Sequence, residues 1–71
     1  MSTNSEKTFK GLGDQFKEAR EKAGLTQAEV AKKAGINVSY YAKIERGEVN
    51  TSFDKIYAIS KVLKIKTLNF P

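Results

Sequence analysis

The 71-residue sequence contains no cysteine and no histidine. Without cysteine, disulfide bonds and thiolate metal sites are excluded, and without histidine the common zinc sites and histidine-based acid–base catalysis are excluded too. No apolar run approaches the roughly 20 residues of a membrane-spanning helix, and the start of the chain lacks the apolar core of a signal peptide. We therefore expect a cytoplasmic protein that needs no metal, cofactor or small-molecule ligand and contacts no membrane.

The charge of the chain is unbalanced, with 13 lysines and arginines against 8 aspartates and glutamates, a net charge of +5. A small basic domain favours an anionic partner, and nucleic acid is the leading candidate. The alternative is that the positive charge serves solubility alone.

Catalysis is not expected. The paired acids, such as Glu18 with Glu21 and Glu45 with Glu48, lie among lysines and arginines on short amphipathic segments. Solvated ion pairs are the ordinary explanation for such spacing, and a helical domain of this size offers little concave volume for an active site.

The spacing of apolar residues predicts a compact all-α bundle of four or five helices, forming a single domain over residues 9–71 after a flexible tail over residues 1–8. The first helix is expected to start near Phe9 and to stop at Gly24. Further helices are expected at about 27–34, 38–46 and 53–63. Residues 64–71 alternate basic and apolar side chains, which is compatible with a strand or with a short fifth helical turn.

The stretch from Thr26 to Gly47 has the pattern of two short helices joined by a tight turn. Thr26 and Glu29 form a capping box, Gly35 suits a left-handed helix end, and Asn37 is a good N-cap. Two short helices with a glycine-containing turn of about four residues make a helix-turn-helix unit. Because a helix turns about 100° per residue, one face of the second helix should be small, polar and basic. That face comprises Ser39, Ala42, Lys43 and Arg46, whereas Tyr41 and Ile44 should face the core.

The sequence resembles the XRE-type helix-turn-helix family, to which lambdoid phage repressors and Cro proteins belong. The resemblance spans about Leu12 to Ile65 and rests on three segments. These are Gly24-Leu25-Thr26-Gln27-Ala28-Glu29-Val30-Ala31, Gly35-Ile36-Asn37 and Tyr40-Tyr41-Ala42-Lys43-Ile44-Glu45-Arg46-Gly47. It implies a small transcriptional regulator that binds double-stranded DNA, with residues 38–46 as the recognition helix in the major groove.

The resemblance also implies roles for single residues. The positions implied to contact DNA are Gln27, Asn37, Val38, Ser39, Tyr40, Ala42, Lys43 and Arg46. Base edges would be reached by Val38, Ser39 and Lys43, and phosphates by Gln27, Arg46 and the Glu48–Ser52 loop. The others would line the same face or touch the backbone. A DNA-binding protein of this kind is expected to be nucleoid-associated.

Two structural features follow from the same resemblance. Arg20 and Glu45 would form an ion pair that ties the first helix to the end of the recognition helix. Family members usually dimerise, so that two recognition helices reach half-sites about 34 Å apart, and we expect a homodimer. The apolar residues proposed for its interface are Ile59, Val62, Ile65, Leu68 and Phe70. The alternative is that these residues only close a small core.

A second function from another class stays open at this stage. The same fold can serve as a protein-interaction module, such as an antitoxin or a docking domain, whose main partner is another protein. A phage-type repressor, a restriction-modification controller and an antitoxin all remain compatible with the sequence.

Overall fold

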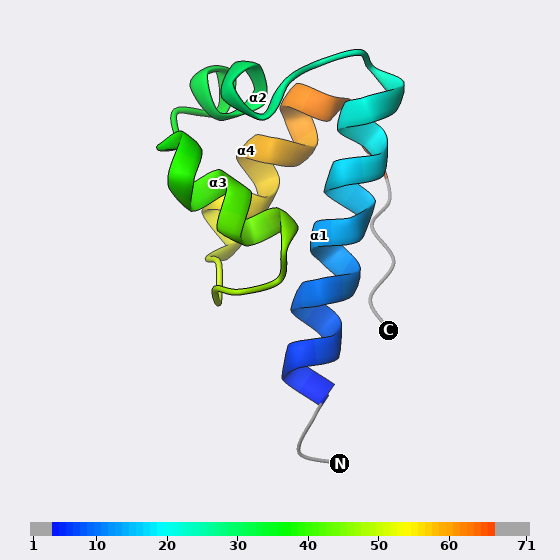
Figure 1. Cartoon of the computed structure of the whole chain (residues 1–71), viewed down its shortest axis with the longest axis vertical. Helices are drawn as coiled ribbons and strands as arrows, with labels where there is room; N and C mark the ends of the chain where they lie inside the picture. The colour runs from blue at the N-terminus through cyan, green and yellow to red at the C-terminus, as the bar shows by residue number, and fades with distance from the viewer. Residues whose placement is uncertain (1–3, 67–71) are drawn as a thin grey trace.

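The structure is a computed structural model, and it describes residues 4–66, with side chains from residue 11 onward. This part of the chain contains four helices and no strand: α1 (Asn4–Lys22), α2 (Gln27–Ala34), α3 (Val38–Glu45) and α4 (Phe53–Leu63). The long helix α1 runs along one side, and α2, α3 and α4 pack together on its other side (Figure 1). The all-α helix-turn-helix fold is therefore as expected, and residues 67–71 lie outside the described part.

Helix α1 begins at Asn4, whereas the sequence predicted its start near Phe9. Residues 4–8 are helical, so the predicted tail over residues 1–8 was too long. Apolar periodicity marks only the turns of a helix that pack on a core. The first turns of α1 carry mainly polar residues, including Glu6 and Lys7, which are good helix formers but give no periodic signal.

Gly13 allows α1 to approach the end of α3 closely. A Cβ atom built at Gly13 would lie 2.4 Å from the carbonyl oxygens of Ile44 and Glu45. These are backbone atoms, which cannot rotate away, so any side chain at this position would push the two helices apart.

Each of the four helices is followed by the same backbone motif, which contains a residue with positive φ. The N–H of that residue and the N–H of the next residue both donate to carbonyl oxygens near the end of the helix. At the end of α3, Gly47 has a φ of 73°. Its N–H donates to the Ile44 carbonyl at 3.0 Å, and the Glu48 N–H donates to the Lys43 carbonyl at 2.9 Å. This is the Schellman arrangement. At the end of α4 the left-handed position is occupied by Lys64, with a φ of 58°, although glycine suits it better.

The core draws residues from each helix. Its buried apolar members are Leu12, Phe16, Val30, Ala31, Tyr41, Ile44, Ile59 and Leu63. Ile59 is 0% exposed, so its assignment to a dimer interface was wrong, because its side chain fills the centre of its own subunit. Val62 and Ile65 are half-buried against the same core, whereas Leu68 and Phe70 lie outside the described residues.

None of the helices within residues 4–66 is long and apolar enough to cross a membrane.

Candidate nucleic-acid interface

Local capping fixes where the two helices of the helix-turn-helix unit begin. The Glu29 N–H donates to Thr26 Oγ1 at 3.1 Å, and the Thr26 N–H donates to Glu29 Oε1 at 2.8 Å, so the predicted capping box is complete. At the start of α3, Asn37 Oδ1 accepts from the N–H groups of Ser39 at 2.8 Å and Tyr40 at 3.2 Å. The side-chain oxygen of Asn37 therefore holds the start of α3 in place.

Helix α3 has one buried face and one open face. Tyr41 and Ile44 are buried in the core. On the other side Val38, Ser39 and Lys43 are exposed and Ala42 is half-buried. We call the set Val38, Ser39, Ala42 and Lys43 the recognition face. Figure 1 shows that α3 lies at the periphery of the bundle, in keeping with the exposure of Val38, Ser39 and Lys43.

The ion pair expected between Arg20 and Glu45 is present and is almost enclosed. Arg20 Nε donates to Glu45 Oε2 at 2.6 Å and Arg20 Nη2 donates to Glu45 Oε1 at 3.2 Å. Only 13% of the Arg20 side chain and 2% of the Glu45 side chain are exposed. Arg20 Nη1 also donates to the Leu25 carbonyl at 3.0 Å. One arginine thus fixes the α1–α2 junction and the end of α3 together.

Gln27 joins the same network. Its Nε2 donates to Glu45 Oε1 at 3.0 Å, and the residue is half-buried. An amide NH₂ carries two hydrogens, so one hydrogen of Gln27 is used by Glu45 and the second is available for another acceptor. The side chain at the start of α2 is therefore held at a fixed position relative to α3.

Electrostatics keep Glu45 ionised inside this network. Burial by itself would raise the pKa of Glu45, but Arg20, the nearby Tyr41 hydroxyl and Gln27 together outweigh burial, and the pKa is lowered. The adjacent Tyr41 hydroxyl is buried and makes no hydrogen bond within the described residues. Burial, followed by the nearby Glu45 carboxylate, raises the pKa of Tyr41 above its usual value.

Arg46 and Tyr40 make contacts that sequence analysis did not anticipate. Arg46 Nε donates to Glu48 Oε2 at 2.7 Å and Arg46 Nη2 donates to Glu48 Oε1 at 3.2 Å. The half-buried Tyr40 ring has Lys55 Nζ 5.6 Å from its centroid, which adds a cation beside α3. Sequence analysis did not single out Lys55, and it assigned Glu48 only to the phosphate-contacting loop after the recognition helix, without a pairing to Arg46. The position of Glu48 two residues after Arg46, across a glycine turn, was the available signal for that pairing.

A hollow of about 540 Å³ connects the ends of the helix-turn-helix unit with α1. Its lining residues are Asp14, Lys17, Gln27, Glu45, Arg46 and Glu48. Gln27 and Arg46, the two residues assigned to phosphate contact, both line this hollow, although they are 19 positions apart in the sequence.

A family model described as "Helix-turn-helix" matches residues 16–70. The chain belongs to the XRE-type helix-turn-helix family. Members of this family are DNA-binding transcriptional regulators, and helices α2 and α3 form the helix-turn-helix unit of this chain.

Two curated relatives are similar to this chain over most of its length. The chain is 36% identical over 55 residues to the immunity repressor protein of Bacillus phage phi105, a match that covers 78% of this chain and 38% of the repressor. It is 32% identical over 54 residues to the HTH-type transcriptional regulator y4dJ of Sinorhizobium fredii, covering 76% of this chain and 70% of that protein. The chain thus spans well under half of the length of the phage repressor.

A solved structure of the family is similar as well. The restriction-modification controller protein C.AhdI from Aeromonas hydrophila superimposes with a TM-score of 0.78 at 31% identity. The match covers 82% of this chain and 88% of the controller protein. The XRE-type fold of this chain is therefore supported by structure as well as by sequence.

Proposed function

We propose that this chain binds double-stranded DNA sequence-specifically as a transcriptional regulator of the repressor or controller type. The observation that carries the proposal is the recognition face, which is open along α3 while the opposite side of α3 is buried. The names of the related phage repressor and restriction-modification controller support this kind of regulator.

The dimensions of α3 suit the major groove. An α-helix with its side chains is about 10–12 Å across, and the major groove of B-DNA, about 12 Å wide, admits one. The eight residues of α3 give a length of roughly 12 Å at about 1.5 Å per residue. The N-terminal end of the recognition helix contacts base edges in this arrangement, and the preceding helix crosses the backbone. Val38 and Ser39 stand at that end of α3, and Lys43 follows one turn later.

Each proposed contact has a chemical basis. Val38, with 43% exposure, can contact a thymine methyl group, whereas Lys43 can donate to guanine O6 or N7. The second amide hydrogen of Gln27 would bond a phosphate at the start of α2. Because Gln27 and the end of α3 are both tied to Glu45, the phosphate contact and the recognition face would keep a fixed separation.

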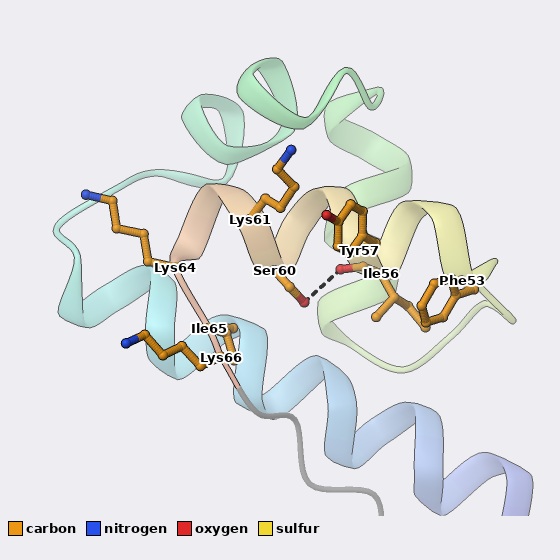
Figure 2. Close-up of a pocket in the computed structure, with 8 residues that line it drawn as sticks. All are labelled: Phe53, Ile56, Tyr57, Ser60, Lys61, Lys64, Ile65 and Lys66. Carbon is orange, nitrogen blue, oxygen red and sulfur yellow. Dashed lines mark hydrogen bonds between the residues drawn. The ribbon is translucent and has the colours of Figure 1, made fainter.

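We also propose that the chain acts as a homodimer through a groove on α4. Phe53 is 76% exposed and Tyr57 is 56% exposed, and their stacked rings lie 6.4 Å apart. With Ile56 and Ile65 they line an open groove of about 550 Å³. Figure 2 shows these side chains along α4, with Lys61 beside Tyr57. This groove replaces the interface predicted around Ile59.

Charge placement along α4 favours a second copy in antiparallel orientation. Asp54 lies in the first turn of α4 and Lys61 in its last turn. Two antiparallel copies of α4 that meet at Tyr57 would set Asp54 of one copy against Lys61 of the other. They would also bring Phe53 near the partner's Lys61, a cation–π arrangement. A twofold interface repeats each such contact.

The DNA-binding proposal is tested by selecting binding sites from a library of random duplexes and then measuring affinity against salt. A protein that neutralises several phosphates should lose affinity by orders of magnitude between about 50 and 200 mM salt. Lys43→Ala should relax the preference at one base position if Lys43 contacts a base, but should weaken all duplexes evenly if it contacts phosphate. Absence of binding to any duplex at 50 mM salt would refute the proposal.

The dimer proposal is tested by sedimentation velocity on the full chain. The wild type should associate with rising concentration, Asp54→Lys and Lys61→Asp should each weaken association, and the double variant should restore it. A wild-type chain that stays monomeric at all concentrations would contradict the self-association, and would instead favour a protein-interaction role for the groove.

A further inference from the structure

The side chain of Arg46 is occupied by a carboxylate on the surface proposed to meet DNA. Two hydrogen bonds join its guanidinium to Glu48, at 2.7 Å and 3.2 Å. Both side chains are about half exposed, at 54% and 50%. This bidentate geometry is the one in which arginine also binds a phosphate group, so a DNA phosphate and Glu48 would compete for the same donors.

The backbone fixes the position of Glu48. The left-handed turn at Gly47 reverses the chain, and the Glu48 N–H bonds the Lys43 carbonyl at 2.9 Å. Glu48 is therefore attached to the last turn of α3. The hydrogen bonds from Arg46, together with the positive charges of Arg46 and Lys43, lower the pKa of Glu48, so its carboxylate is ionised at neutral pH.

Glu48 also shares a hollow with Gln27, next to Arg46. A phosphate that bonds Gln27 would lie at the mouth of this hollow, where Glu48 presents a negative charge. The negative charge of Glu48 would repel a DNA phosphate bound in this hollow. Glu48 is exposed, so packing of the core does not require a carboxylate at this position.

We propose that Glu48 is an internal competitor for DNA phosphate, which holds Arg46 in the free protein and is displaced when DNA binds. The inference rests on the proposed DNA-binding function and deepens it. If Glu48 competes in this way, it lowers the affinity of the protein for every DNA duplex. Since phosphate contacts carry no sequence information, Glu48 restrains binding to specific and unrelated DNA alike.

The test compares the wild type with Glu48→Gln on a selected site and on an unrelated duplex, between about 50 and 200 mM salt. Freeing Arg46 from an exposed ion pair and removing one repulsive charge should tighten binding about three- to ten-fold on both duplexes. The slope of log affinity against log salt should steepen by about one unit, because one more phosphate contact forms without internal competition.

Glu18→Gln is the matched control. Glu18 also belongs to an exposed ion pair, with Lys22 Nζ 3.5 Å from its Oε2, and the substitution changes net charge equally but on α1. It should alter affinity by less than about two-fold. A second control is Arg46→Ala, in whose background Glu48→Gln should lose most of its effect, as expected for coupled residues.

The outcomes separate the two proposals. If the wild type binds DNA but Glu48→Gln binds equally or more weakly, Glu48 positions Arg46 for phosphate and the inference is overturned while the function stands. If the gain is the same in the Arg46→Ala background, competition for Arg46 is likewise refuted. If the wild type binds no duplex at all, the proposed function fails, and the inference fails with it.

Discussion

Replacing Glu45 by glutamine should destabilise the fold far more than a surface substitution. The change leaves the Arg20 guanidinium, which is 13% exposed, without a counter-charge. Removing one partner of a buried ion pair costs about 3–5 kcal/mol. Glutamine keeps an acceptor oxygen, and the Leu25 carbonyl still accepts from Arg20, so we expect a smaller loss of about 2–3 kcal/mol. For a domain of this size that lowers Tm by roughly 10–20 °C.

The assay is thermal and urea unfolding followed by circular dichroism, with Glu18→Gln as the control. The control pair is exposed, at 69% for Glu18 and 76% for Lys22, so its loss should change stability by less than about 1 kcal/mol. The reasoning is refuted if Glu45→Gln costs no more than Glu18→Gln. That result would mean that solvent screens the Arg20–Glu45 pair like an ordinary surface contact.

The pH profile of the same two proteins gives an independent check. The pKa of Glu45 is lowered in the folded state relative to an unfolded value of about 4.3. The pair therefore contributes its full stability above that unfolded pKa, and the contribution is lost as the pH falls through the folded pKa. As the pH falls below about 4.3, the wild type should lose more stability than Glu45→Gln. If the stability of the wild type and of Glu45→Gln falls equally with pH, the lowered pKa of Glu45 is contradicted.

Three further substitutions test other parts of the packing. Gly13→Ala should cost about 1–3 kcal/mol in urea unfolding despite the better helix propensity of alanine, because its Cβ meets carbonyl oxygens at the end of α3; equal stability would show that the helices can separate freely. Tyr41→Phe should keep or raise Tm, since the buried hydroxyl has no hydrogen-bond partner among the residues that the structure describes; a fall of several degrees would reveal a hydrogen bond. Lys64→Gly should raise stability by about 0.5–1 kcal/mol by relieving the positive φ, whereas Lys66→Gly should not.

Local signals in the sequence were sufficient for α2, α3 and α4. The capping box at Thr26, the N-cap at Asn37 and the glycine at position 35 act within a few residues of each other, so their effect can be deduced without tertiary information. The predicted ranges 27–34 and 53–63 match α2 and α4, and α3 ends one residue before the predicted 38–46. The division of α3 into a core side and an open side also follows from its period.

Features that depend on which helices meet could not be deduced in this way. The close approach at Gly13 requires knowing that α1 crosses the end of α3. Ile59 was misplaced because both sides of α4 carry apolar residues, and only the packed structure shows that Ile59 faces inward while Phe53 and Tyr57 face out. The Arg46–Glu48 pair depends on the left-handed turn at Gly47, which brings two exposed side chains together.

The most direct test of the central claim is to map the DNA contact surface by NMR, titrating the ¹⁵N-labelled chain with a selected duplex. The account predicts that the largest amide shifts fall at Gln27, at Val38 and Ser39 at the start of α3, and on the turn at Gly47. Shifts confined to the α4 groove around Phe53 and Tyr57, or no shifts at low salt, would contradict the claim that α3 is the DNA-binding helix.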